Sequence, residues 1–283
     1  MKGNKDFEGE FDRLYKLVKG NCGFSFARFS DGERVVLRNK KLVIAENYFI
    51  QEDLFGNVKR GTPGGKSYLP EERKEFIPEK HSFFHDKLIE AYKFRKTNYF
   101  KGICGDNELT DASAGADTVS TWRWMVDLHG GEDDSLTYAN VFLNRNYPLF
   151  VEKMIPEFMN HDVILIANKN STTDLLPFKV KKFFPIGENC MINDYGLIEK
   201  IKDYIREENI SNHLFLFSAA TLSNYLCYEL YKEFDNNKYM DIGSTLGPLL
   251  GLEGWKNSRS YLLSYWYNVP SPYIHQADTW GKI

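Results

Sequence analysis

The sequence of 283 residues is poor in cysteine and has no long apolar run. Its four cysteines, Cys22, Cys104, Cys190 and Cys227, lie far apart and form no Cys-x-x-Cys pair, so we interpret them as reduced core thiols. The N-terminal residues lack the apolar core of a signal peptide, and no apolar stretch approaches the ~20 residues of a membrane helix. These absences predict a cytoplasmic protein without membrane insertion.

The chain also lacks a strong excess of charge. Its formal net charge is −3 and its pI is near 6.1, which argues against a generally basic nucleic-acid binder but leaves room for a local basic groove. Hydrophobic residues make up 42% of the chain, enough for a large packed core, and the length predicts a single domain over 1–283. Abundant Asn, Lys, Tyr, Phe and Ile are typical of AT-rich bacterial or viral genomes, and a viral protein would act in the host cytoplasm.

Apolar runs alternate with amphipathic segments along the chain. This alternation predicts an α/β fold, with a Rossmann-like, mostly parallel sheet flanked by helices. Two segments depart from it: 46–80, rich in Gly and Pro, is predicted as a loop-rich insertion, and 245–283 as an aromatic C-terminal extension. Strands are predicted at 24–29, 42–45, 99–104, 138–143, 162–168, 179–186, 214–217 and 239–242, and helices at 6–19, 32–38, 81–96, 146–159, 193–208 and 222–234.

The predicted strand at 24–29 ends in a turn that holds two carboxylates. Asp31 and Glu33 flank Gly32, which lets the backbone turn tightly so that both side chains can face one point. In an open α/β sheet, ligands bind at the carboxyl edge of the strands. Two hard oxygen ligands at one point favour Mg²⁺ or Mn²⁺, an ion that usually also holds the phosphates of a substrate. The alternative is a solvated turn, because Ser-Asp-Gly-Glu is ordinary turn composition.

Two stretches resemble a known family. Arg28-Phe29-Ser30-Asp31-Gly32-Glu33 resembles the Arg-aromatic-Gly-Asp-Gly-Glu signature of the GT-D-type glycosyltransferases, first catalogued as domain of unknown function 1792. Asp241-Ile242-Gly243-Ser244 resembles the family's Asp-Ile-Gly-His, with serine where histidine is common. The resemblance implies a GT-D-type fold and transfer from a nucleotide-diphosphate sugar, with UDP as the expected nucleotide. It implies that Asp31 and Glu33 are catalytic and hold the metal, that Asp241 is catalytic, and that the nucleotide sugar binds at Arg28, Phe29, Ser30 and Gly243. Ser244 is a further candidate for nucleotide-sugar binding, but no direct role of the family's histidine is carried over to it.

The sequence leaves the role of two of these residues open. Arg28 points off the strand beside the motif, where it can pair with a phosphate or fix a carboxylate. Asp241 can bind ribose hydroxyls, assist the metal or serve as the base for the acceptor.

Further candidates follow other strands at the same edge. Ser218-Ala219-Ala220-Thr221 lies between a strand and a helix, where free backbone N–H groups and the positive helix end favour an anion. Lys169 follows the strand at 162–168, where it either meets phosphate or stands in a plain polar loop. Asp106 follows the strand at 99–104 and is a candidate for acceptor binding. Trp122 and Trp124 either offer an aromatic platform to the acceptor or fill the core.

Together these patterns predict a metal-dependent glycosyltransferase that moves a sugar to an acceptor hydroxyl. A saccharide is the default acceptor. The alternative acceptor is a hydroxymethylated base in DNA, modified by a viral enzyme whose lysines and arginine at 59, 60, 66, 179, 181 and 182 would have to share one face. A nucleotide-sugar hydrolase and a non-catalytic nucleotide-binding module are the other two classes that the sequence leaves open.

Overall fold

The computed structural model describes residues 6–53, 55–62, 67–104 and 118–254, together with 256, 262 and 266. Two residues named above, Lys66 and Asp106, therefore lie outside the described residues. So does most of the predicted aromatic extension beyond residue 254.

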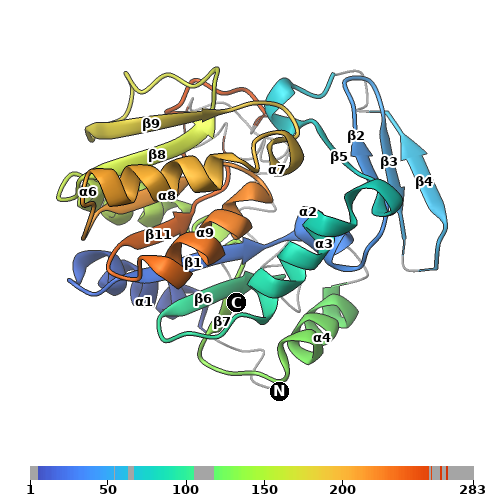
Figure 1. Ribbon diagram of the computed structural model, residues 1–283, viewed down its shortest axis with the longest axis horizontal. Coiled ribbons are helices and arrows are strands. Elements are labelled where there is room, and N and C mark those ends of the chain that lie inside the picture. Colours follow the sequence, from blue (N-terminus) through green and yellow to red (C-terminus); the bar gives the residue numbers. More distant parts are fainter. Residues whose placement is uncertain are drawn as a thin grey trace.

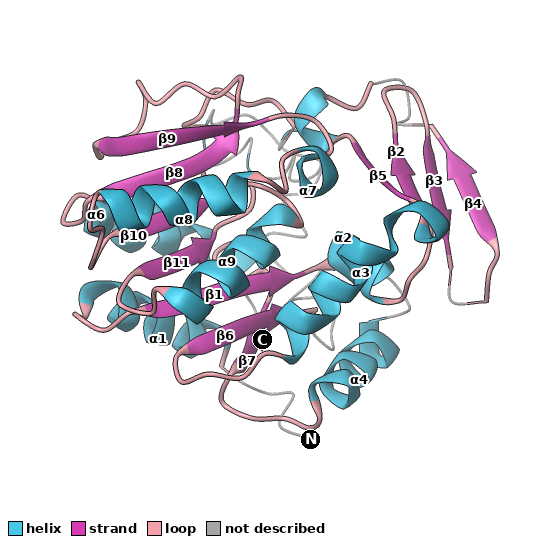
Figure 2. Cartoon of the chain, in the orientation of Figure 1, coloured by secondary structure: helices cyan, strands magenta, loops and turns pink. Residues whose placement is uncertain are grey.

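A seven-stranded sheet forms the centre of the molecule, in the order β7-β6-β1-β11-β10-β8-β9 (Figures 1 and 2). Every neighbouring pair is parallel, so the carboxyl ends of all seven strands meet at one edge. The predicted parallel α/β fold is therefore confirmed. The strands are β1 (Phe24–Phe29), β6 (Tyr99–Ile103), β7 (Leu136–Tyr138), β8 (Val163–Asn168), β9 (Val180–Ile186), β10 (Leu214–Phe217) and β11 (Lys238–Asp241).

Strand β7 differs most from its prediction, which placed a strand at 138–143. It ends at Tyr138, and the chain then turns back on itself: the N–H of Val141 donates to the Tyr138 carbonyl and the N–H of Leu143 to that of Asn140. The apolar residues at 141–143 are buried, so their hydrophobicity reflects core packing and not a continued strand.

Helices cover both faces of this sheet. Helices α3 (Pro78–Lys93), α8 (Leu197–Glu207) and α9 (Leu222–Glu233) lie on one face, and α4 (Thr118–His129) packs beside α3 (Figure 1). Helix α1 (Phe7–Lys19) and a helical stretch, η3 (Asn144–Asn146), α5 (Tyr147–Leu149), η4 (Phe150–Met154) and α6 (Ile155–Phe158), lie on the other. Helix α8 illustrates the cause, since Ile198, Ile201 and Ile205 recur at helical spacing and are buried.

A second sheet of four antiparallel strands stands beside the first, in the order β4-β3-β2-β5 (Figure 1). Its strands are β2 (Leu42–Ile44), β3 (Phe49–Glu52), β4 (Val58–Gly61) and β5 (Lys74–Phe76), with a 3-10 turn, η1 (Pro70–Glu72), before β5. The prediction of a loop-rich insertion at 46–80 is corrected here, because this segment supplies three of the four strands. They escape notice in the sequence because strands of three or four residues are too short to display an alternating pattern.

No helix among the described residues has the length and apolar character needed to cross a membrane. All four cysteines are free thiols, of which Cys22 is exposed and the other three are buried.

Lys101 is an ionisable residue inside the core. The side chain of Lys101 on β6 has no exposed surface, and its Nζ lies 3.2 Å from Nδ1 of His129, whose Nε2 lies 3.0 Å from Oδ2 of Asp133. Burial lowers the pKa of Lys101 from 10.5 to about 7, because the interior disfavours the charged ammonium. Folding therefore expels a proton from this lysine at weakly alkaline pH.

We predict that Lys101 makes the stability of the protein rise with pH. Between about pH 7 and pH 9.5 the unfolded chain holds the lysine proton and the folded chain does not, so the free energy of unfolding should rise by up to about 1.4 kcal/mol per pH unit. The free energy of unfolding of Lys101→Met should not show this rise. Urea unfolding of both proteins across this range measures the difference, in which the titration of other groups cancels. A difference that does not change with pH would show that the buried lysine stays charged.

Candidate functional site

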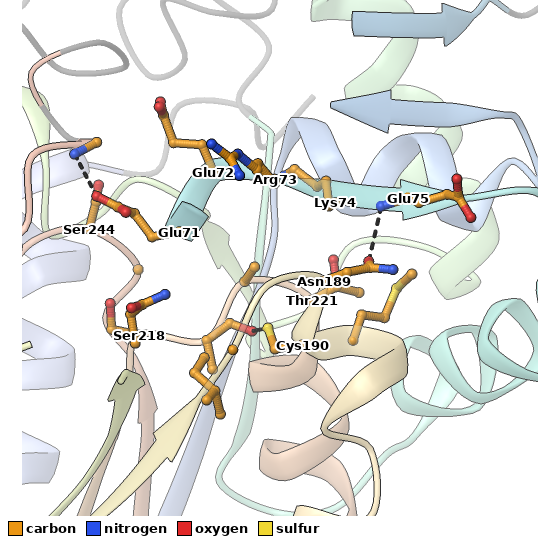
Figure 3. A pocket seen from close by; sticks show the side chains of 18 of the residues that line it. Glu71, Glu72, Arg73, Lys74, Glu75, Asn189, Cys190, Ser218, Thr221 and Ser244 are labelled. Atoms are coloured by element: carbon orange, nitrogen blue, oxygen red, sulfur yellow. Dashed lines mark hydrogen bonds between the residues drawn. The ribbon is translucent and has the colours of Figure 1, made fainter. Parts of the chain in front are cut away.

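A cavity of about 210 Å³ lies between the carboxyl edge of the large sheet and strand β5 of the small one (Figure 3). Its floor comes from the loops after β10 and β11, one wall from η1 and β5, and another from α7 (Cys190–Asn193) and the residues before it. Sequence-predicted residues that line it are Ser218, Ala219, Ala220, Thr221, Gly243 and Ser244. Residues from at least four parts of the chain thus meet at the edge where an open α/β sheet binds ligands.

The loop from Ser218 to Thr221 forms part of the floor. Ala220 has a φ of +43°, in the left-handed region that residues with a Cβ rarely adopt. The N–H of Ala219 donates to Oγ of Ser223, whereas no described residue accepts a hydrogen bond from the N–H of Ala220 or Thr221. Because α9 begins at Leu222, these two donors stand at the positive end of a helix, an arrangement that favours an anion.

The two carboxylates after β1 lie in different surroundings. Helix α2 (Asp31–Leu37) begins with a capping box in which the N–H of Ser30 donates to Oε2 of Glu33 at 3.1 Å. Oε1 of Glu33 accepts from the hydroxyl of Thr221 at 2.7 Å, and the residue is only 7% exposed. Asp31 is exposed, with Oδ1 3.2 Å from Oγ of Ser30. The expectation that both side chains face one point is therefore corrected: capping turns Glu33 inward and leaves Asp31 outside.

The surroundings of Asp31 and Glu33 decide how these carboxylates could hold the predicted divalent metal. No three His, Cys, Asp or Glu side chains among the described residues are arranged to share an ion. Each oxygen of Glu33 already accepts one hydrogen bond, so Asp31 is the more accessible ligand. Mg²⁺ commonly uses one or two carboxylates and completes its shell with water and substrate phosphates. The residues therefore fit an ion that a diphosphate substrate helps to hold, and not a cage made by the protein alone.

Asp241 lies beneath the floor of the cavity and does not line it. It is 4% exposed, and its carboxylate accepts from the N–H of Gly243 at 3.0 Å and the N–H of Arg28 at 3.3 Å. Burial raises the pKa of Asp241 to about 7; Glu33 adds to this rise, and the Arg28 guanidinium, 3.8 Å away, opposes it. This carboxyl therefore titrates in the neutral range.

The Arg28 side chain explains the glycine of the C-terminal motif. Its Nε donates to the carbonyl of Ala139 and its Nη1 lies against Asp241, so the guanidinium is held under the loop. Gly243 has a φ of +52°, and a Cβ built there would lie 1.6 Å from Nη1 of Arg28. Of the two roles the sequence left open for Arg28, these contacts favour that of fixing a carboxylate.

Two predicted binding residues belong to the core. Phe29 has no exposed surface and packs edge-on against Tyr92, and Trp122 is 3% exposed and lies against Tyr138. Neither ring has a free face for a ligand, so their assignment to the nucleotide sugar and the acceptor is corrected. Phe29 lies on strand β1 and Trp122 on helix α4, and the local sequence does not show whether an aromatic side chain there faces a site or the core.

The remaining candidates lie away from the cavity or at its margin. Trp124 is partly buried, and the guanidinium of Arg38 lies over its ring in a cation–π contact. Lys169 is exposed beyond β8 and does not line the cavity, while its neighbour Asn168 does. Ser30 serves as the N-cap of α2.

Several residues of the cavity were missed by the sequence analysis. Lys74 and its neighbours on β5 form one wall, and Asn189 and Cys190 form another (Figure 3). Burial raises the pKa of the Cys190 thiol to about 12, and its Sγ donates to the carbonyl of Ala219, so it is a structural group. The sequence carries little signal for this strand, because Arg73-Lys74-Glu75-Phe76 is short and has three charged residues in a row before its one apolar residue.

Comparisons with known proteins bear on the fold. No family model matches the sequence, and a search of curated proteins finds no match. Among solved structures, the chain is similar to one described as a new glycosyltransferase (DUF1792) from Streptococcus sanguinis, with a TM-score of 0.51, 16% identity, and coverage of 85% of this chain and 81% of that one. A second, described as domain of unknown function 1792 with a distinct glycosyltransferase fold, gives 0.47 and 13% identity over 82% and 76%. The chain therefore adopts the GT-D glycosyltransferase fold of DUF1792.

Proposed function

We propose that this protein is a glycosyltransferase that takes its sugar from a nucleotide-diphosphate donor. The observation that carries the proposal is the cavity at the carboxyl edge of the GT-D fold, which Ala220 and Thr221 line and which the Thr221 hydroxyl connects to Glu33 beneath it. Two hydroxyls, of Ser218 and Ser244, stand in the same cavity. Such a set of donors suits a diphosphate, with UDP as the expected nucleotide.

The chemical demand at this site is stabilisation of the leaving group. As the bond to the anomeric carbon breaks, the sugar becomes oxocarbenium-like and the diphosphate gains negative charge. The fixed N–H donors of Ala220 and Thr221, at the N-terminal end of α9, stabilise that charge without needing to reorganise. A Mn²⁺ or Mg²⁺ ion held by Asp31, with Glu33 beside it, would add Lewis-acid stabilisation of the same oxygens.

Asp241 serves this site as a positioning residue. Its carboxylate holds the N–H of Gly243, which lines the cavity, and the backbone and guanidinium of Arg28. The charged form makes these contacts better than the neutral acid does, since ionised acceptors form the stronger hydrogen bonds. Ionisation of Asp241 therefore favours the active shape of the floor.

A saccharide is the acceptor that we favour over DNA. The DNA alternative needs Lys59 and Arg60 to share a face with the lysines at 179, 181 and 182. Lys59 and Arg60 lie on β4 and the three lysines on or next to β9, and these edge strands of two different sheets are far apart in Figure 1. Lys181 is further engaged with Asp162 and His213. The buried ring of Trp122 removes half of the aromatic platform that a flipped base would need.

The first prediction from this proposal tests the reaction class. With Mn²⁺ present, the protein should release nucleoside diphosphate from one of a panel of nucleotide sugars, and much faster when a saccharide acceptor is added. The measurement is transfer of radiolabelled sugar to saccharides and to hydroxymethylcytosine DNA at several salt concentrations. Release without dependence on any acceptor would identify a hydrolase, and binding without release a non-catalytic module. Salt-sensitive labelling of DNA alone would reverse our choice of acceptor.

The second prediction separates the two carboxylates. Asp31→Asn should nearly abolish turnover with little change in stability, because the side chain is exposed and asparagine keeps an oxygen that can accept from Ser30. Glu33→Gln should also lose turnover, and in addition about 1–3 kcal/mol of stability, because its amide cannot accept from both Ser30 and Thr221. Donor turnover and urea unfolding of both variants measure this. Near-native activity of Asp31→Asn with unchanged Mn²⁺ dependence would refute the metal assignment.

The third prediction concerns pH. Turnover should increase as Asp241 ionises through about pH 7, and Asp241→Asn should lose this step in the profile along with most of its activity. The pKa of Asp241 is higher in the folded protein than in the unfolded chain. As the pH rises from about 4 to about 7, the stability of the wild type should therefore fall relative to that of the Asn variant. A pH–rate profile and unfolding curves at matched pH provide the two readouts. An Asn variant that keeps the wild-type profile would assign the step to another group.

A further inference from the structure

The wall of the cavity that η1 and β5 form carries two cations, Arg73 and Lys74. Arg73 is already engaged: its guanidinium lies 3.2 Å from Glu188 and 3.5 Å from Glu46, and its Nε donates to the carbonyl of Tyr68. Lys74 differs from it, because no carboxylate among the described residues forms an ion pair with its ammonium. Lys74 is half-buried and lines the cavity, so an ammonium that pairs with none of the described carboxylates is available to a ligand.

The backbone of β5 aims this lysine at the start of α2. Alternate residues of a strand share a face, so Lys74 points to the same side as Phe76, which is 1% exposed in the core. A Cβ built on Gly32 would lie 3.0 Å from Nζ of Lys74, which places the ammonium beside the residue that separates Asp31 from Glu33. Figure 3 shows Lys74 on the strand that lies across the cavity from Ser218 and Thr221.

Asn189 holds the strand on both sides of Lys74. Its N–H donates to the carbonyl of Arg73 at 3.2 Å, and its Oδ1 accepts from the N–H of Glu75 at 3.0 Å (Figure 3). The other edge of β5 pairs with β2, where Lys74 stands opposite Ile44. Two elements from different parts of the chain therefore fix the position of this residue. The side chain that results is not a loosely placed surface lysine.

We propose that Lys74 binds the diphosphate of the donor, so that the small sheet completes the site formed by the large one. This inference rests on the proposed function and adds a residue that the motifs do not contain. The donor phosphates would lie between the N–H groups of Ala220 and Thr221 on one side and the ammonium on the other. An ammonium at this point stabilises both the bound diphosphate and the charge that it gains as the sugar departs. It also offsets the negative charge of Asp31 and Glu33, which would otherwise repel the phosphates.

The test is the affinity of the wild type, Lys74→Met, Lys74→Arg and Lys59→Met for a nucleoside diphosphate and for the matching nucleoside. Calorimetry with Mn²⁺ first identifies which of UDP, dTDP, CDP, GDP and ADP the wild type binds most tightly. Lys74→Met should weaken binding of that diphosphate by about tenfold or more and of the nucleoside by less than about twofold. Lys74→Arg should retain most of the affinity, because the charge remains.

Lys59→Met is the matched control, because Lys59 belongs to the same small sheet and is exposed outside the cavity. It removes the same charge and should leave both affinities unchanged. Lys74→Gln replaces the Met variant if urea unfolding shows that the latter is not folded. Equal binding of the diphosphate by wild type and Lys74→Met, or equal losses for diphosphate and nucleoside, would overturn the inference alone. A wild type that binds none of the diphosphates would overturn the proposed function, and this inference with it.

Discussion

The hydrogen bond from the Thr221 hydroxyl to the buried carboxylate of Glu33 is the contact on which the site depends. It joins residues 188 positions apart, at the starts of the helices that follow β1 and β10. The other oxygen of Glu33 caps its own helix through the N–H of Ser30. One side chain therefore fixes both the turn that presents Asp31 and the loop that presents the N–H groups of Ala220 and Thr221. Because the carboxylate is buried, losing either partner leaves a costly unpaired group.

A second set of contacts supports the floor from below. Asp241 ends β11 and receives hydrogen bonds from Arg28 on β1 and from Gly243 in its own loop. The guanidinium of Arg28 fills the space that a side chain at 243 would need, which is why glycine stands there. Two motifs at opposite ends of the chain are thus parts of one packed unit beneath the cavity, and ionisation of Asp241 acts on both.

The small antiparallel sheet gives the cavity its remaining wall. Strand β5 is held by β2 on one edge and by Asn189 on the other, so the sheet is attached to the main body where a ligand would lie. The wall places Lys74 opposite the floor and brings Glu71 to the N–H groups of Glu253 and Gly254. A segment rich in Gly and Pro is thereby an integral part of the site.

The sequence by itself determined the parallel α/β fold, the strand and turn around Asp31 and Glu33, and the small-residue loop before α9. It did so because each is a local pattern: apolar runs of strand length, amphipathic helices and turn residues between them. Only the tertiary structure decided that Glu33 turns inward and Asp31 outward, that Phe29 and Trp122 belong to the core, and that Lys74 faces the cavity. These outcomes depend on partners far away in the chain, such as Thr221, Tyr138 and Asn189. A pattern read over a few neighbouring residues carries no information about such partners, and the strands of the small sheet are too short to form a pattern.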